Sequence, residues 1–188
     1  EDTRRARVLL GRVGARPEVL SYHAHSPPAR TEELLRRLAG GDDLVLLTDA
    51  GTPAVSDPGA VLVRRAREIG ATPVAVPGPS AVTAALSISG LPADRYSFLG
   101  FPPRKGAGRR RLLETAAASA WTVVWFEAAA RVARLLEDLA AVCGGDREGA
   151  VARELTKVHE ELTSGTLDDL AAHFRRHPPR GEVTVLVA

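Results

Sequence analysis

The chain has 188 residues, of which 45% are hydrophobic and 26% are charged, with a net charge of +2. These values are those of a soluble globular protein, large enough for one domain or two small ones. No apolar run reaches the roughly 20 residues that span a bilayer, and no signal peptide opens the chain, so we expect no membrane association. A single cysteine, Cys143, excludes an internal disulfide and favours a reducing, cytoplasmic location.

The first half alternates helical segments with short β-rich runs. Helices are expected at residues 3–13, 30–38, 57–69 and 81–89, and strands at residues 18–22, 44–48 and 73–76. Asp57 and Pro58 favour the third helix start, since Asp caps free amides and Pro suits the first helical position; Ser80 can cap the fourth. The alternation favours a mostly parallel sheet with helices on its faces. Gly90-Leu91-Pro92 then breaks the chain, which predicts one lobe over residues 1–91 and a second over residues 92–188.

The second half alternates less regularly and predicts a second lobe with a mixed sheet. Strands are expected at residues 96–100, 121–127, 149–153 and 183–187, and helices at residues 108–118, 129–142 and 166–174. Thr166 and Asp169 have the spacing of a capping box for the last helix. The overall fold class is therefore α/β.

The loop from Thr48 to Gly59 joins a buried strand to a helix. In open α/β sheets, ligands bind outside the carboxyl ends of strands, where this loop lies. Asp57 already has a role as a helix cap, which leaves Asp49 as the better ligand contact. The loop lacks the Gly-rich nucleotide pattern and the Lys of a phosphate loop. A second stiff loop, from Pro77 to Ala81, also follows a strand. For the first loop a plain turn without a ligand is the less favoured alternative, whereas the second loop by itself is more typical of a turn than of a site.

A basic segment follows the predicted lobe boundary, and its positive charges suit a phosphate backbone, although a solvated loop and helix start is an equal alternative. It contains Arg104, Lys105, Arg109, Arg110 and Arg111. Aromatic residues form only 4% of the chain, which does not support a stacking platform for single-stranded RNA. His23 and His25 share a strand face but have no third ligand nearby, so RNA contact or simple exposure is favoured over zinc.

The two loops together resemble the tetrapyrrole methylase superfamily. They read Asp-Ala-Gly-Thr-Pro-x-x-x-Asp-Pro-Gly, from Asp49, and Val-Pro-Gly-Pro-Ser-Ala, from Val76. Further segments resemble one branch, the ribosomal RNA small subunit methyltransferase I family: Glu-Asp-Thr-Arg at residue 1, Gly-Leu-Pro at 90, Gly-Phe-Pro-Pro at 100, Phe-Glu at 126, Ala-Arg-Glu-Leu-Thr-Lys at 152 and Gly-Glu-Val at 181. The resemblance covers essentially the whole chain. That family begins with a strand and a Thr-Pro-Ile-Gly-Asn-like loop upstream of Glu-Asp-Thr-Arg. The chain has no Met and starts at Glu1, so we expect its natural N-terminus to lie upstream.

The resemblance implies a two-lobed enzyme with a cofactor cleft between the lobes. It would transfer a methyl group from S-adenosyl-L-methionine to the ribose 2′-hydroxyl of a cytidine in the 16S rRNA of the small ribosomal subunit, as a homodimer. The implied cofactor residues are Asp49, Ala50, Gly51, Thr52, Ser80, Ala81, Phe126, Ala152, Arg153 and Glu182. The basic segment would then bind RNA, and replacing Arg109, Arg110 and Arg111 with Ala would weaken that binding alone.

The transfer requires loss of the hydroxyl proton, so a nearby base or cation would help. The candidates are Asp2, Glu127, Glu154 and Lys157, for each of which an ordinary ion pair is the alternative. No metal is required. Two other functions stay open: a methyltransferase for precorrin- or uroporphyrinogen-type tetrapyrroles, and a non-catalytic RNA-binding protein on this fold. A nucleoside-triphosphate enzyme is disfavoured by the missing Gly-Lys-Ser/Thr signature.

Overall fold

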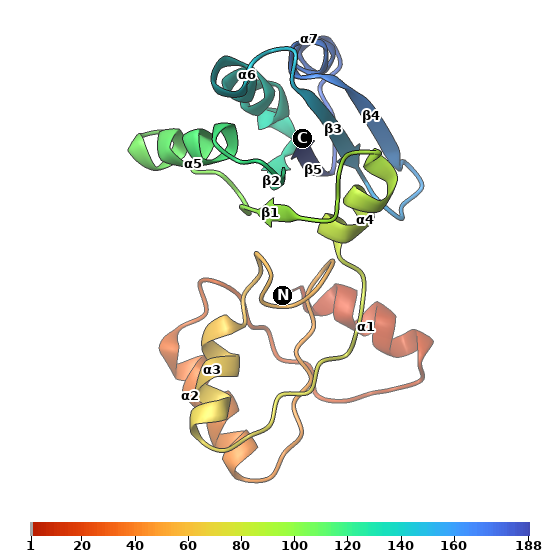
Figure 1. The fold of residues 1–188 in the computed structure, drawn as a ribbon. Helices are drawn as coiled ribbons and strands as arrows, with labels where there is room; N and C mark the ends of the chain where they lie inside the picture. The colour runs from red at the N-terminus through yellow and green to blue at the C-terminus, as the bar shows by residue number, and fades with distance from the viewer. Residues whose placement is uncertain (1) are drawn as a thin grey trace. The chain divides into compact units, whose positions relative to one another are not determined.

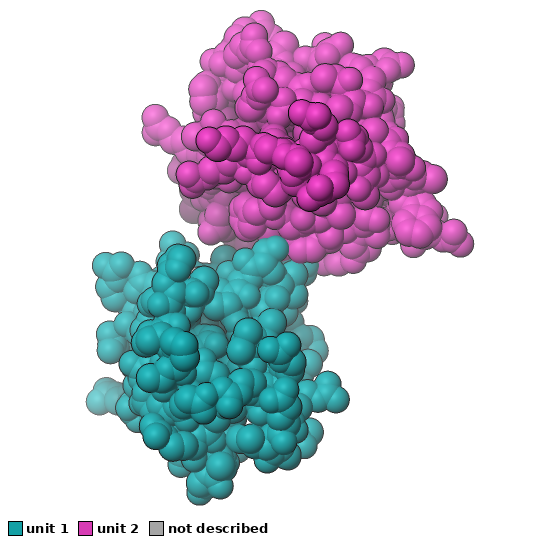
Figure 2. Space-filling view, turned by 90° about the vertical axis from the view of Figure 1, so that its left-hand side faces the viewer, with its two compact units in different colours: residues 1–80 teal, residues 81–188 magenta. Residues whose placement is uncertain are grey.

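The computed structural model describes residues 2–188, and the chain divides into two compact units, residues 1–80 and 81–188 (Figure 2). The division falls ahead of the boundary expected after residue 91. The reason is helix α4 (Ala81–Ser89), which packs on the sheet of the second unit. Its Val82 and Leu86 lie in one buried cluster with Val124 and Leu186. The helix was expected over the same residues, but its apolar face assigns it to the second unit.

The first unit contains helices α1 (Thr3–Arg12), α2 (Pro28–Ala39) and α3 (Ala60–Glu68), close to three of the expected helices. A small core joins α2 to α3 and consists of Leu34, Leu35, Leu62 and Ala66. The expected start of α3 at Asp57 is wrong, because the N-cap position is occupied by Gly59. Gly59 has φ +140°, and a Cβ there would lie 2.6 Å from Leu46 Cδ2, so only glycine fits at this point.

The three runs expected as strands in the first unit are not paired into a sheet within residues 2–80. Leu20 and Leu44 pack against the core under α2 and α3, so one side of these runs is covered. Val45, Val74 and Val76, by contrast, are between 81% and 86% exposed. Parallel strands are normally buried on both faces, and here the apolar runs are covered on one side only. The parallel sheet expected in this lobe is therefore not formed by the described residues.

The second unit is built on a five-stranded mixed sheet, as expected (Figure 1). Its strands are β1 (Tyr96–Phe98), β2 (Thr122–Ala128), β3 (Glu148–Arg153), β4 (Glu161–Thr166) and β5 (Glu182–Val187), in the order β1-β2-β5-β3-β4. Strand β1 is parallel to β2, and the other pairs are antiparallel. Four strands were expected. The fifth, β4, was missed because its sequence Glu-Leu-Thr-Ser-Gly-Thr has a single large apolar residue.

Helices cover both faces of this sheet (Figure 1). One face packs against α5 (Ala107–Ala117), α6 (Val132–Cys143) and α7 (Leu167–Arg176), and the opposite face packs against α4. Trp125 lies at the centre of the larger cluster and is fully buried. Thr166 is confirmed as the N-cap of α7: its Oγ1 accepts the Asp169 amide at 3.2 Å and donates to the Asp169 carboxylate at 2.8 Å. Among residues 2–188, no helix is both long and apolar enough to traverse a bilayer.

Candidate functional site

The two loops singled out from the sequence are tied together in the first unit. Thr52 Oγ1 donates a hydrogen bond to the Pro79 carbonyl at 3.0 Å, which links the loop after residue 48 to the loop after residue 76. The first loop has a strongly turned backbone, with positive φ at Gly51, Ala54 and Ser56. A Cβ on Gly51 would meet nothing within 4 Å, so the backbone there is open to a ligand. Ala50 beside it is exposed.

Asp49 and Asp2 also lie together. The Asp2 amide donates to Asp49 Oδ1 at 2.9 Å, which fixes the start of α1 against the loop. Asp2 itself caps α1, since its Oδ1 accepts the Arg4 amide at 2.9 Å. The Arg4 guanidinium also pairs with its carboxylate at 2.6 Å, and these bonds lower the pKa of Asp2 to about 2. A carboxyl group so firmly ionised is a weak proton acceptor, so the expected alternative for Asp2, an ion pair, is what the structure contains.

Phe126 and Glu127 point to opposite faces of the sheet, as neighbours on a strand must. Phe126 lies on the face that packs against α4. Glu127 lies on the face of Trp125, where its carboxylate is fully buried and pairs with Arg131 at 2.5 Å. Its Oε1 also accepts the Ala128 amide at 2.8 Å, while Oε2 is buried without a partner among the described residues. Phe126, expected beside the cofactor, and Glu127, expected as a candidate base, therefore lie on opposite faces of the sheet.

A row of side chains crosses the middle of the sheet on the α4 face. The strand register places Phe126 opposite Thr184, and Thr184 opposite Ala152. Phe126 and Ala152 were expected to contact cofactor, and the register brings them to one face. Thr184 between them is buried and was missed, because its place depends on the pairing of β2, β5 and β3, which the sequence does not reveal.

Three charged candidates meet at the end of this sheet. Lys157 Nζ lies 2.9 Å from Glu154 Oε1 and 3.0 Å from Glu182 Oε2. Glu154 Oε1 also accepts the Glu182 amide at 2.9 Å. This amide bond, followed by Lys157, lowers the pKa of Glu154. The carboxylate lies against Gly181, where a Cβ would come within 2.2 Å of Oε1 at φ +84°. Glycine at this position is thus required by the site.

Three of the expected cofactor residues have local roles in the structure. Arg153 forms a cross-strand ion pair with Glu161 at 2.6 Å, from β3 to β4. Ser80 and Ala81 stand at the beginning of α4, as the sequence predicts. The cleft expected between the lobes stays a prediction.

The basic segment separates into one buried arginine and four exposed cations. Arg109 is 8% exposed, its Nη2 pairs with Asp138 Oδ2 at 2.8 Å, and its Nη1 donates to the Pro103 carbonyl at 3.1 Å. The expected RNA contact of Arg109 is therefore corrected: its guanidinium holds the segment against α6. The remaining cations are exposed and consist of Arg104, Lys105, Arg110 and Arg111.

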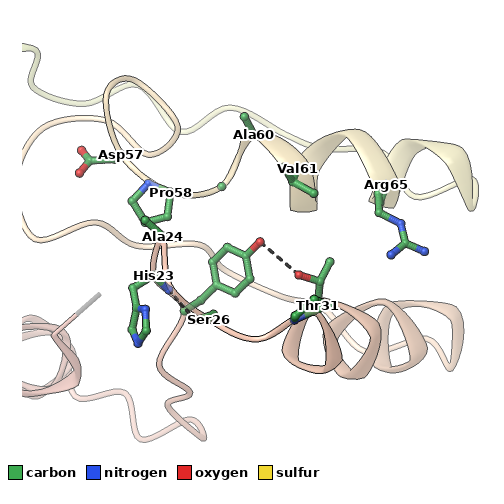
Figure 3. A pocket seen from close by; sticks show the side chains of 12 residues that line it. His23, Ala24, Ser26, Thr31, Asp57, Pro58, Ala60, Val61 and Arg65 are labelled. Carbon is green, nitrogen blue, oxygen red and sulfur yellow. Dashed lines mark hydrogen bonds between the residues drawn. The ribbon is translucent and has the colours of Figure 1, made fainter. Parts of the chain in front are cut away.

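A pocket of about 450 Å³ lies in the first unit, beside the starts of α2 and α3 (Figure 3). His23, Asp57 and Arg65 contribute to its wall. On its wall the Tyr22 hydroxyl is bonded to Thr31 Oγ1 at 3.3 Å. His25 is not among the lining residues; its amide donates to His23 Nδ1 at 3.2 Å. Within the described part of the chain, no three His, Cys, Asp or Glu side chains are grouped as metal ligands.

Comparison with known families and sequences gives consistent results. Residues 6–171 match the family described as Tetrapyrrole (Corrin/Porphyrin) Methylases. Proteins named ribosomal RNA small subunit methyltransferase I are 44% identical in Xylella fastidiosa, 45% in Mesorhizobium japonicum and 39% in Thermotoga maritima. Each alignment covers 100% of this chain, and 69%, 64% and 84% of the respective relative. The chain thus spans about two thirds of the length of the first two.

Solved structures show the same fold at low sequence identity. A cobalt precorrin-4 methyltransferase of cobalamin biosynthesis superposes with a TM-score of 0.68 at 19% identity, over 94% of this chain and 77% of that one. The uroporphyrin-III C-methyl transferase of Thermus thermophilus, solved with S-adenosyl homocysteine, gives 0.58 at 18% identity, over 85% and 72%. The chain therefore has the α/β tetrapyrrole methylase fold.

Proposed function

Since the chain belongs to the ribosomal RNA small subunit methyltransferase I family of the tetrapyrrole methylases, we propose that it methylates the ribose 2′-hydroxyl of a cytidine in 16S rRNA, using S-adenosyl-L-methionine. The observation that carries this proposal is the unbroken similarity, 39–45% identity over the whole chain, to relatives of that name. We further propose a cytoplasmic homodimer that acts on the small ribosomal subunit.

The residues present suit this cofactor, which carries an ammonium group, a ribose diol and an adenine. Asp49 supplies a carboxylate beside the open backbone of Gly51, where an ammonium or hydroxyl group can donate. Thr52 holds this loop to the second one and so keeps its shape. Phe126, which is only partly buried, offers an aromatic contact for a flat ring, and the buried Thr184 and Ala152 lie beside it in the sheet. When bound, S-adenosylmethionine supplies an electrophilic methyl group on a sulfonium centre.

The charge of Lys157 is the feature best suited to the acceptor hydroxyl. As that oxygen loses its proton, negative charge develops on it, and a fixed ammonium group stabilises such charge. Glu154 and Glu182 orient the ammonium group from two sides. Glu127 does not serve here, because its carboxylate is buried on the opposite face with Arg131.

The test is methyl transfer to purified small ribosomal subunits by the full-length protein, with radiolabelled S-adenosylmethionine and mapping of the labelled nucleotide. We expect one labelled cytidine, modified at its 2′-oxygen. Lys157→Ala should lower kcat at least tenfold, while Lys157→Arg keeps part of the activity. Label on a precorrin- or uroporphyrinogen-type substrate instead would favour the tetrapyrrole alternative. Absence of cofactor binding in calorimetry would favour a non-catalytic RNA-binding protein.

A further inference from the structure

Phe101 is an exposed aromatic ring at the carboxyl end of the only parallel strand pair of the second unit's sheet. The pairing of β1 with β2 continues past Phe98, since the Leu99 amide donates to Val124 at 2.9 Å and the Phe126 amide donates to Gly100 at 3.0 Å. Phe101 follows directly and is 53% exposed. Its ring packs against Phe126, with centroids 5.6 Å apart, and Phe126 packs edge-on against Phe98 at 4.8 Å. One side of Phe101 is thus supported by aromatic rings while much of the ring stays accessible.

The segment after Phe101 is held in place by its backbone and by Arg109. Pro102 is buried, and the two prolines restrict the chain before the exposed cations. Arg109 donates to the Pro103 carbonyl at 3.1 Å while its guanidinium is fixed by Asp138. An exposed ring on such a restrained segment loses little conformational freedom when a ligand covers it.

The segment that begins with the ring carries charged side chains of a single sign. Residues 101–113 contain no Asp or Glu, and Arg104, Lys105, Arg110 and Arg111 are exposed. Arg104 and Lys105 follow the ring within four residues. An accessible aromatic face beside several cations matches the chemistry of unpaired RNA, in which flat bases alternate with phosphates.

We propose that Phe101 stacks on an unpaired base of the RNA substrate, while Arg104 and Lys105 bind the neighbouring phosphates. This inference rests on the proposed function, which supplies the RNA substrate. It adds a residue, Phe101, that distinguishes single-stranded from duplex RNA. The low aromatic content excludes a broad stacking platform, yet one supported ring is enough for one base. Arg109 takes part as a positioning residue, because it holds the segment that carries the ring.

Stacking and phosphate binding differ in how the RNA affinity depends on salt concentration. Phosphate contacts release counterions, so each one adds about 0.7 to the slope of log affinity against log salt for a single strand. Stacking releases none. Phe101→Ala should therefore weaken binding of a single-stranded RNA oligonucleotide about 5- to 100-fold with an unchanged salt slope. Arg104→Ala with Lys105→Ala should instead reduce the slope by about 1.4, for two contacts.

The experiment measures fluorescence anisotropy of labelled single-stranded and duplex RNA at several salt concentrations, with the full-length protein. Phe101→Trp should keep the affinity, and Phe101→Leu should lose it. Trp121→Ala is the matched control: Trp121 is 47% exposed, precedes the amino end of β2 and lies under the Arg95 guanidinium at 5.9 Å. It should leave single-strand affinity unchanged.

Two outcomes would overturn the inference. One is an equal loss for single-stranded and duplex RNA in Phe101→Ala. The other is weakened S-adenosylmethionine binding in calorimetry with unchanged RNA affinity, which would place the ring at the cofactor. Failure of the proposed function is seen separately, as absence of methyl transfer by the unmodified protein, and it does not alter the comparison of RNA affinities between variants.

Discussion

The two units of this protein reach compactness by different means. In the second unit, five hydrogen-bonded strands bury their side chains under helices on both faces, and residues such as Trp125, Val124 and Leu186 are 0% exposed. In the first unit, the described residues form three helices and extended runs without paired strands. Its best-buried apolar side chains, such as Leu35 and Leu62, still keep 5–8% exposure.

The difference shows that an apolar run can form a paired strand in one unit while a similar run in the other unit stays unpaired. Leu44 to Thr48 and Thr122 to Ala128 are both rich in apolar residues, yet only the second becomes a strand. Strand β2 has a partner on each side and helices over both faces. Val45 is 81% exposed, because the first unit covers only one side of its runs. Burial by neighbours, more than local sequence, decides whether such a run joins a sheet.

The largest expected effect concerns the core of the second unit. Trp125→Ala should lower the free energy of unfolding by about 3–5 kcal/mol, since it leaves a large cavity. Leu62→Ala in the first unit should cost about 2 kcal/mol, because its surroundings can relax. Urea denaturation gives the two values, and amide hydrogen exchange shows which unit opens. If Leu62→Ala lowered the free energy of unfolding more than Trp125→Ala does, the comparison of the two units would be reversed.

Arg109 and Arg110 are adjacent but differ in burial, which gives a second test. Arg109→Ala leaves Asp138 with only Arg134 and should destabilise the protein by about 1–3 kcal/mol. Arg110→Ala should change stability by less than about 0.5 kcal/mol, because its side chain is exposed. For RNA binding we expect the opposite order. Arg110→Ala should reduce the slope of log affinity against log salt, because the exposed side chain is the one that would contact phosphate directly. Thermal unfolding and anisotropy measure the two effects; equal stability of both variants would contradict the structure.

A matched pair of valine substitutions tests whether the apolar runs of the two units differ in burial. Val124→Thr places a hydroxyl in the buried sheet and should cost about 1–3 kcal/mol. Val74→Thr makes the same change at a side chain that is 81% exposed, and should be nearly neutral. Chemical denaturation of both variants makes the comparison. A cost at Val74 similar to that at Val124 would mean that the first unit buries this run in solution.

The smallest expected effect is at the cap of α1. The pKa of Asp2 is lowered from its ordinary 3.8 to about 2 by Arg4, so its stabilising contribution is fully present above pH 4 and is lost as the pH falls toward 2. Chemical shifts and hydrogen exchange of the Arg4 amide should report fraying of α1 over that range. Asp2→Asn keeps a capping oxygen at all pH values and should remove this dependence. A pH response that persists in Asp2→Asn would have another origin.

The sequence predicted the helices well because their apolar periodicity is local, and it predicted four strands of the second unit from apolar content. Two features that differ from the expectations could have been predicted from the sequence alone. Arg109 shares a helical face with Leu113 and Ala116, which signals burial. Strict alternation along a strand already separates Phe126 from Glu127. Thr184 and the Lys157 cluster, by contrast, depend on strand register and on a turn, which are set by distant partners.

The position of β5 has a consequence for synthesis. Residues 182–187 form the central strand of the sheet, between β2 and β3, although they are the last of its five strands in sequence order. Until they have left the ribosome, β1 with β2 and β3 with β4 are two separate ribbons, each with an unpaired inner edge. Exposed strand edges are prone to aggregate. The nascent second unit should therefore depend on a chaperone, or on rapid completion, for longer than its length suggests.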